Sequence, residues 1–177
     1  DKIIIGVSGG ADSLALLNIF HEIKSTFSLE LIAAHVHHGL RGKDADEDAE
    51  FVEQICKDWQ IPFYLKRADV RKLAGDWGVS EEEAGRRVRY EFFDQLLEDL
   101  NGQKIALGHH RDDQAETILY NLIRGTGLKG LQGMKPVREG KIIRPLLQIS
   151  REEIEQYCFE KGLKFRTDIT NEENIYV

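Results

Sequence analysis

Short apolar runs alternate along the chain with longer segments in which apolar residues recur every three or four positions. The runs are rich in β-branched residues and predict buried strands at residues 3–7, 29–36, 62–65 and 104–107, with a short extended segment at 142–147. The periodic segments predict helices at about residues 14–23, 44–60, 80–100, 112–123 and 150–158. Strands that alternate with helices indicate an α/β fold, so we expect an open parallel sheet of about five strands with helices on both faces.

The pattern lapses between the third and fourth strands, around Gly75, Trp77 and Gly78, and we expect irregular structure there. The helix that begins at Asp112 should bury one face, formed by Ile118, Leu119, Leu122 and Ile123. Residues 124–133 follow it and are rich in glycine, so we expect a mobile loop that orders over a substrate.

The composition indicates that residues 1–177 form a single globular domain. The chain is 41% hydrophobic and 31% charged, and no apolar run approaches the length that crosses a membrane. Cys56 and Cys158 lie far apart, which argues against a disulfide framework or a zinc knuckle and fits a reducing cytoplasm. Both fall in helical apolar stripes, so we expect them in the core. The chain begins at Asp1 rather than Met and stops abruptly at Val177, so we expect a fragment of a longer protein.

The stretch that follows the first strand combines several signals for anion binding. A pair of glycines lets the backbone turn tightly and approach a ligand, and the next helix aims its positive end and its free N–H groups at the same point. Two serine hydroxyls add donors for phosphate oxygens. An aspartate beside a phosphate indicates that Mg²⁺ lies between them. The stretch consists of Ser8, Gly9, Gly10, Ala11, Asp12 and Ser13.

This glycine turn matches neither of the commoner nucleotide-binding loops. A P-loop requires a lysine after its last glycine, whereas Ala11 follows Gly10, and the G-x-G-x-x-G pattern of dinucleotide folds is absent. The letters SGGADS resemble SGGxDS, the pyrophosphate loop of the N-type ATP pyrophosphatases. The resemblance implies that ATP binds, that pyrophosphate leaves and that AMP passes to a substrate oxygen. An ordinary strand–turn–helix corner built from small residues is the alternative.

Histidines follow the second and fourth strands, at the edge of the sheet where α/β proteins bind ligands. His35, His37 and His38 are of the type that ligates metals, but no cysteine or further ligand pattern completes a zinc site. We prefer a polar loop over a nucleotide, with His35 near the adenine or ribose. We also expect His109 to contact ATP, and we leave the roles of His37, His38 and His110 open.

Two pairs of charged residues each share a helix face. Arg86 and Arg89 lie three positions apart and suit phosphate contacts, although a solvated basic face is the commoner outcome. Asp113 and Glu116 have the same spacing at a helix start, and two such carboxylates suit Mg²⁺ or a cationic substrate. Enrichment of acids at a helix N-terminus is the simpler explanation of Asp113.

In their order, these motifs resemble one family over essentially the whole chain. SGGADS, AHVHHGLRG, the RxxRY of residues 86–90, GHHRDDQAET, RGTGLKGLQGM and RPLLQISREEIEQYC are similar to the N-terminal catalytic domain of tRNA(Ile)-lysidine synthetases. The resemblance implies a Rossmann-like, adenine nucleotide alpha hydrolase-like fold. It also implies a two-step ligation that uses ATP and Mg²⁺. ATP adenylates the C2 oxygen of the wobble cytidine of a tRNA(Ile) with a CAU anticodon and pyrophosphate leaves; the amine of free L-lysine then attacks C2 and AMP leaves.

The resemblance also implies roles for individual residues. Residues 8–13 would hold the pyrophosphate, and Asp12 would hold Mg²⁺. Arg89, with Arg86, would steady the α-phosphate or the activated base. Asp113 and Glu116 would receive the ammonium groups of lysine. The catalytic residues on this interpretation are Asp12, Arg89, Asp113 and Glu116.

The net charge of −7 disfavours an RNA-binding surface. Basic residues nevertheless gather in the second half of the sequence, at Arg124, Lys129, Lys135, Arg138, Lys141 and Arg144. We expect Arg86, Arg124 and Lys129 to contact tRNA. The family carries further tRNA-binding domains, which we expect beyond this chain, and we leave open whether the protein is a homodimer.

Three other functions stay open at this stage. A tRNA-thiolating ATP pyrophosphatase would need cysteines placed for persulfide or iron–sulfur chemistry. The GMP, asparagine and NAD synthetases share SGGxDS, but the HVHHGLRG and DDQAET clusters have no match in them. A catalytically silent nucleotide-binding or RNA-binding module is the third.

Overall fold

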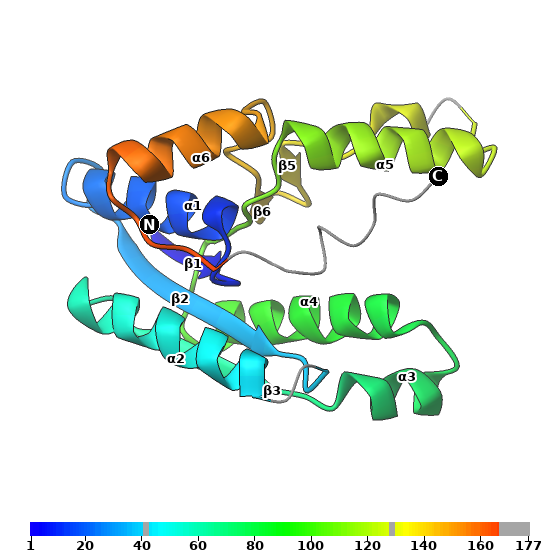
Figure 1. Cartoon of the computed structure of the whole chain (residues 1–177), viewed down its shortest axis with the longest axis horizontal. Helices are drawn as coiled ribbons and strands as arrows, with labels where there is room; N and C mark the ends of the chain where they lie inside the picture. Colours follow the sequence, from blue (N-terminus) through cyan, green and yellow to red (C-terminus); the bar gives the residue numbers. More distant parts are fainter. Residues whose placement is uncertain (41–42, 128–129, 167–177) are drawn as a thin grey trace.

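Six strands form one sheet in the computed structural model, which describes residues 1–40, 43–127 and 130–166 (Figure 1). Their order across the sheet is β3-β2-β1-β4-β6-β5, and neighbours are parallel except for the antiparallel pair β5 and β6. The strands are β1 (Lys2–Gly6), β2 (Glu30–His37), β3 (Phe63–Arg67), β4 (Lys104–Ala106), β5 (Val137–Arg138) and β6 (Ile142–Ile143). The predicted α/β class is confirmed. Strand β5 was not predicted, because two residues are too few to show a period.

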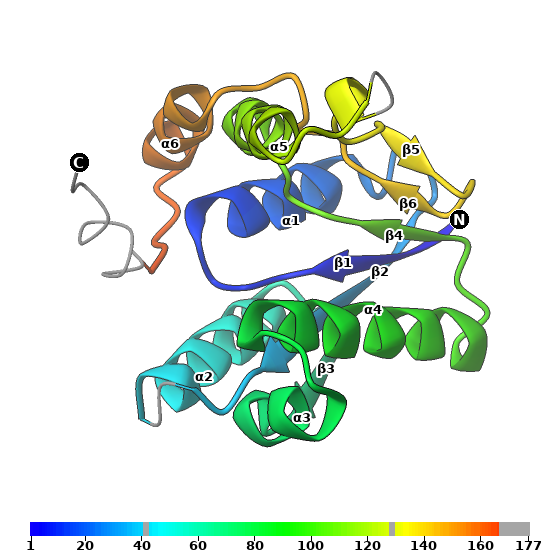
Figure 2. The ribbon, with the colours of Figure 1, turned by 90° about the vertical axis from the view of Figure 1, so that its right-hand side faces the viewer.

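Helices cover both faces of this sheet, as predicted (Figure 2). Helices α1 (Ala11–Ile23) and α6 (Arg151–Glu160) lie on one face, and α4 (Glu81–Asp99) lies on the other. The remaining helical segments are α2 (Lys43–Asp58), α3 (Val70–Trp77), α5 (Arg111–Ile123) and the 3₁₀ turn η1 (Gly130–Gln132). Among the helices described, none combines the length and the apolar character that crossing a membrane requires.

Alternation along β1 divides the hydrophobic core between the two faces. Ile3 and Ile5 belong to a cluster with α1, α2 and α6, whereas Ile4 belongs to a second cluster with α4. Full burial of one such side chain contributes about 1.5–3 kcal/mol to folding. Cys56 and Cys158 are fully buried free thiols in the first cluster, which confirms their predicted place in the core.

The expectation of irregular structure around Gly75 and Trp77 is wrong, because α3 forms there. The side chain of Asp69 caps the helix and accepts a hydrogen bond from the backbone N–H of Lys72 at 3.0 Å. Gly78 ends the helix in the left-handed conformation, with φ at 67°. The two glycines that argued against a helix are compatible with one, because Gly75 lies inside α3 and Gly78 is its C-cap.

The expected burial of α5 is also wrong. None of its residues is buried, and Leu119, Leu122 and Ile123 are 57%, 57% and 84% exposed. The C-terminal part of α5 extends past the sheet in Figure 1. The helix is held to the segment that follows it by Gln114, whose side chain exchanges hydrogen bonds of 3.0 and 2.6 Å with the backbone of Met134. The spacing of the apolar residues predicted the helix correctly, but that spacing carries no information on what covers the apolar face.

The strand order opens a crevice at the carboxyl ends of β1 and β4. The chain leaves β1 through α1 and returns in β2 on one side, whereas β4 pairs with β1 on the other side. The connections that follow β1 and β4 therefore diverge, and α/β sheets bind ligands at such a point. Residues 7–13 and 107–110 meet there.

Candidate active site

Ser13 organises the glycine turn between β1 and α1. Its hydroxyl accepts hydrogen bonds from the backbone N–H groups of Ser8 and Gly9, at 3.1 and 3.2 Å, and donates to the carbonyl of Gly10 at 3.0 Å. The hydroxyl of Ser8 accepts from the N–H of Gly10 at 3.4 Å. The N–H groups of the loop therefore converge on two hydroxyl oxygens. A phosphate oxygen is a stronger acceptor than a hydroxyl and would compete for the same donors.

Asp12 stands beside this turn, in the first turn of α1. Its Oδ1 is buried and accepts no hydrogen bond from the described residues. The nearest donors stop short of it: Nε2 of His110 lies 3.7 Å from Oδ1, and Nη1 of Arg151 lies 3.6 Å from Oδ2. Burial raises the pKa of Asp12, and the neighbouring His110 and Arg151 partly oppose that rise. The positive charge near the Asp12 carboxylate therefore does not offset the cost of burying it.

Gly108 brings the end of β4 against the first turn of α1. A Cβ atom at this position would lie 3.1 Å from both the carbonyl carbon and the oxygen of Asp12. A side chain there would force the first turn of α1 to shift by a few tenths of an ångström, so the close approach favours glycine.

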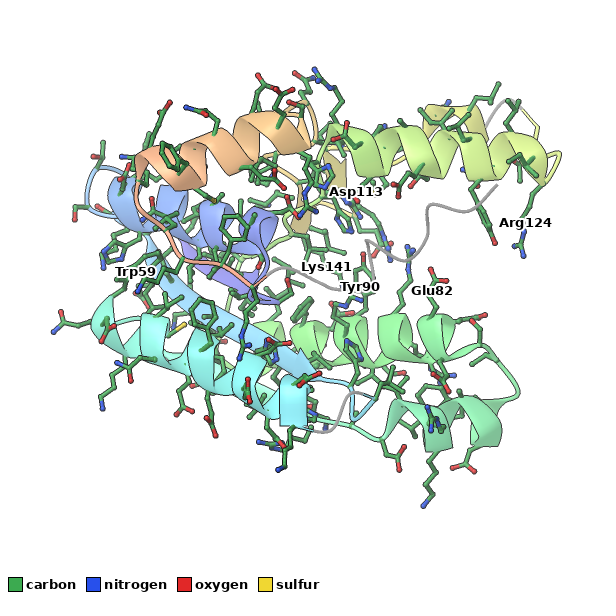
Figure 3. The ribbon with its side chains drawn as sticks, viewed as in Figure 1. Trp59, Glu82, Tyr90, Asp113, Arg124 and Lys141 are labelled. Carbon is green, nitrogen blue, oxygen red and sulfur yellow. The ribbon has the colours of Figure 1, made fainter. Side chains whose placement is uncertain are left out.

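His110 caps α5, with Asp113 as its partner. The Nδ1 of His110 accepts a hydrogen bond from the N–H of Asp112 at 3.2 Å, and Oδ2 of Asp113 accepts one from the N–H of His110 at 2.9 Å. Asp113 therefore has a structural role at the helix terminus. Glu116, one turn later, is exposed. Figure 3 shows Asp113 at the beginning of α5 and Arg124 at its far end.

The three histidines at the end of β2 have different surroundings. Nδ1 of His35 lies 2.7 Å from the carbonyl of Val7, and Nε2 of His37 lies 3.3 Å from Oδ1 of Asp46. His38 lies close to α4, since a Cβ atom on Gly85 would come within 3.1 Å of its Nδ1. Burial, followed by the charge of Arg89, lowers the pKa of His38 to about 4. The three imidazoles face different neighbours.

Arg89 and Arg86 occupy different environments, although they are three positions apart on α4. Arg89 is partly buried, and burial lowers its pKa. Arg86 is exposed and lies 5.6 Å from the centre of the Tyr90 ring. Arg89 lines the crevice, whereas Arg86 does not.

The crevice is a cavity of about 420 Å³. It collects most of the residues that the sequence assigns to ATP, together with the one predicted catalytic cation: Ser8, Gly10, Asp12, Ser13, His35, His109 and Arg89. Gly9 and Ala11 belong to the same turn without lining the cavity. Asp113, Glu116, Arg86 and Arg124 are absent from its lining, and Lys129 lies outside the described residues.

Comparison with known proteins identifies the family. A model of the PP-loop domain matches residues 1–177. The chain belongs to the PP-loop domain family. It is 51% identical to the tRNA(Ile)-lysidine synthase of Caldanaerobacter subterraneus subsp. tengcongensis and 51% identical to that of Clostridium tetani, over 99% of this chain in both cases. The matched region is 38% of each of these proteins, so the chain spans about two fifths of the length of its curated relatives.

Two solved structures share the PP-loop fold. The U34-tRNA thiolase NcsA from Methanococcus maripaludis matches with a TM-score of 0.78 over 94% of this chain and 59% of its own, at 22% identity. The NH3-dependent NAD synthetase from Campylobacter jejuni matches with a TM-score of 0.57 over 98% of this chain and 76% of its own, at 16% identity. At these identities the likeness concerns the fold alone.

Arg166 is a residue of the PP-loop cavity that sequence reasoning missed. Its backbone N–H donates to the carbonyl of Gly9 at 3.0 Å, and its side chain pairs with Glu47 and Asp48 of α2 at 3.0 and 3.1 Å. The segment after α6 therefore crosses the PP-loop. No local pattern marks it, because the contact joins positions that are far apart in the sequence.

The predicted basic cluster of the second half is wrong at one of its positions, Arg144. Arg144 is only 5% exposed, so it is no surface residue. Arg138 pairs with Glu139 at 2.9 Å, and Lys141 pairs with Asp94 at 2.7 Å. These three cations are engaged within the domain.

Proposed function

We propose that this PP-loop domain contains the catalytic site of a tRNA(Ile)-lysidine synthetase. Such an enzyme joins L-lysine to C2 of the wobble cytidine of an isoleucine tRNA with a CAU anticodon. The observation that carries the proposal is the 51% identity to lysidine synthases along 99% of this chain. The cavity supports it, because Asp12, Arg89 and His109 line one space beside the glycine turn.

ATP fits the cavity with its triphosphate at residues 8–13. The converging N–H groups and the positive end of α1 favour an anion at that point. A cavity of about 420 Å³ lies within the usual size range of small-molecule sites. His35, buried against β1, would then lie near the adenine or ribose.

Asp12 fits the role of ligand to Mg²⁺. Its buried Oδ1 lacks a hydrogen-bond partner among the described residues, and a hard cation supplies what such an oxygen needs. Within the described ranges, no three His, Cys, Asp or Glu side chains group into a metal centre of their own. Phosphate oxygens and water would therefore complete the coordination, as is usual for Mg²⁺. When bound, Mg²⁺ neutralises charge on the departing pyrophosphate.

In the first step, the C2 oxygen of cytosine attacks the α-phosphorus, and the bond from that phosphorus to the bridging oxygen breaks. Negative charge spreads over the α-phosphate oxygens during the transfer. Arg89 is a partly buried cation in the cavity, and a preorganised cation stabilises such charge more strongly than one in water. The turn at residues 8–13 holds the pyrophosphate as it leaves.

In the second step, the ε-amine of lysine attacks C2, the C2–O bond breaks and AMP leaves. The amine must first lose a proton, because only its neutral form is nucleophilic. Asp113 and Glu116 are the proposed partners of the lysine ammonium groups. Asp113 already accepts the N–H of His110, so the exposed Glu116 is the carboxylate with more freedom to take that proton.

The tRNA must present an unstacked cytosine to this cavity. Arg86 and Arg124 are exposed and suit phosphate contacts outside it, and Lys129 is proposed for the same role from its sequence position. Further tRNA contacts would come from domains beyond this chain, in the cytoplasm where tRNA is modified.

Exchange of labelled pyrophosphate into ATP tests the first step. The full-length protein should catalyse exchange only when tRNA(Ile) is present, because the cytosine oxygen is the acceptor of AMP. Exchange without tRNA would contradict adenylation of the base. An absence of exchange under all conditions would indicate a silent binding module.

A further inference from the structure

A buried arginine stands behind the histidine that lines the cavity. Arg144 directly follows β6, which pairs in parallel with β4, so it emerges at the same sheet edge as His109. Its Nε donates to Nδ1 of His109 at 3.2 Å, and its Nη1 donates to the carbonyl of Lys135 at 2.7 Å. Arg144 is 5% exposed, and neither acceptor carries a negative charge. Burial of a guanidinium against neutral acceptors is costly, which indicates a specific role.

The direction of this hydrogen bond fixes the proton of His109. A guanidinium has donors and no acceptor, so Nδ1 of His109 must accept and must carry no proton. The remaining proton of the neutral ring is then on Nε2. A second proton on Nδ1 would face a cationic N–H, so the imidazolium is disfavoured as well.

We propose that Arg144 is a positioning residue that keeps His109 neutral, with its proton on Nε2, so that His109 presents an N–H donor to the ligand in the cavity. The use of that donor in the reaction rests on the proposed function. There it would stabilise a phosphate or base oxygen without acting as a base. The site therefore includes the end of β6, in addition to the ends of β1, β2 and β4 that were predicted from the sequence.

The electrostatics around His109 agree with this assignment. Burial, followed by the charge of Arg144, lowers the pKa of His109 to about 4. Asp113 opposes the shift, and Arg89 and Arg86 add to it. His109 therefore stays neutral across the pH range in which enzymes of the cytoplasm work.

Nitrogen NMR of the imidazole rings tests the proposal directly. In the ¹⁵N-histidine-labelled protein, two-bond correlations show which ring nitrogen carries the proton, and a His109→Gln variant assigns the signals. We expect the Nε2–H form alone between about pH 5.5 and 7.5, a range of about one pH unit either side of the ordinary histidine pKa of about 6.5. Arg144→Met should give a mixture of tautomers and a pKa closer to 6.5, whereas Arg144→Lys should keep the donor and the wild-type signature.

A matched control is Arg87→Met. Arg87 also packs against a ring: its guanidinium carbon lies 4.3 Å from the centre of the Trp77 ring. It makes no contact with His109 among the interactions described above. This variant should leave the His109 signals unchanged. In the pyrophosphate-release assay, Arg144→Met should lower kcat about tenfold with little change in KM for ATP, and Arg144→Lys should restore most of it.

A proton on Nδ1 of His109 in the wild type would overturn the proposal, and so would an unchanged tautomer and pKa in Arg144→Met. If Arg144→Met does not fold, the wild type and Arg144→Lys still provide the tautomer test. The NMR result does not depend on catalysis. A protein that forms no lysidine yet shows the fixed Nε2–H tautomer would therefore contradict the proposed function and support the role of Arg144.

Discussion

Oδ1 of Asp12 lies 3.7 Å from Nε2 of His110, the nitrogen that carries the proton because Nδ1 of the same ring accepts the N–H of Asp112. The contact joins the first turn of α1 to the cap of α5, and so joins the loops that follow β1 and β4. It is too long for a hydrogen bond. The carboxylate is therefore held close to a donor without being satisfied by it, a state that a bound cation would relieve.

Asp12→Ala should separate activity from stability. The variant should lose pyrophosphate release, because the proposed Mg²⁺ ligand is gone. Its free energy of unfolding at pH 7 should equal or exceed that of the wild type. The reason is that a carboxyl with a raised pKa in the folded state reduces stability at any pH where it is charged.

Urea unfolding and a pyrophosphate assay measure the two effects of Asp12→Ala. Asp58→Ala removes an exposed carboxylate of α2 that accepts from Gln54 at 2.7 Å, and this control should keep its activity. Normal turnover by Asp12→Ala would contradict the role of Asp12.

The proposed lysine pocket is tested more cleanly at Glu116 than at Asp113. Glu116→Gln removes a charge-assisted contact of roughly 1.5–3 kcal/mol, so KM for lysine should rise about ten- to a hundredfold. Helix stability should change little, because Glu116 is exposed. Asp113→Asn should show the same kinetic effect together with a loss of stability of about 0.5–2 kcal/mol from the damaged cap.

The adenylation half-reaction, assayed without lysine, is the control for both variants and should change much less. An equal fall in both half-reactions would place the two carboxylates at Mg²⁺ or ATP.

Local pattern predicted the sheet, most helices and the glycine turn, because each depends on residues close in sequence. The burial of Arg144 and the exposure of Leu122 were mispredicted, because burial depends on which distant segment lies opposite. Helix α3 was missed because its two caps are single residues, Asp69 and Gly78, that also occur in loops. Arg166 reaches the PP-loop only through the fold.

Acidification should destabilise the domain through two half-buried imidazoles. His38 and His109 have pKa values lowered to about 4, chiefly by burial, whereas an unfolded histidine titrates near 6.5. The unfolded chain therefore binds more protons between those two values, and stability is lost as the pH falls through that window. Each imidazole contributes at most about 1.4 kcal/mol per pH unit.

Urea unfolding across this pH window measures the slope of stability. The variants His38→Asn and His109→Asn should each show a shallower slope than the wild type. Slopes that match the wild type in both variants would count against burial as the cause.

Both cysteines should be dispensable for the reaction. Burial raises the pKa of Cys56 to about 12 and also raises that of Cys158, so neither forms the thiolate that sulfur transfer requires. The double variant Cys56→Ser, Cys158→Ser should lose ~1–2 kcal/mol of stability from polar groups in the core and keep its kcat. Loss of activity in a folded double variant would favour a thiolation reaction.

The central claim is tested most directly by incubating the full-length protein with tRNA(Ile), ATP, Mg²⁺ and radiolabelled L-lysine. The account predicts that label enters the tRNA, that entry requires ATP, and that digestion releases the label as a modified cytidine from the wobble position. Substitution of Asp12 by alanine should abolish incorporation. A full-length protein that consumes ATP with tRNA and leaves the label in free lysine would contradict the account.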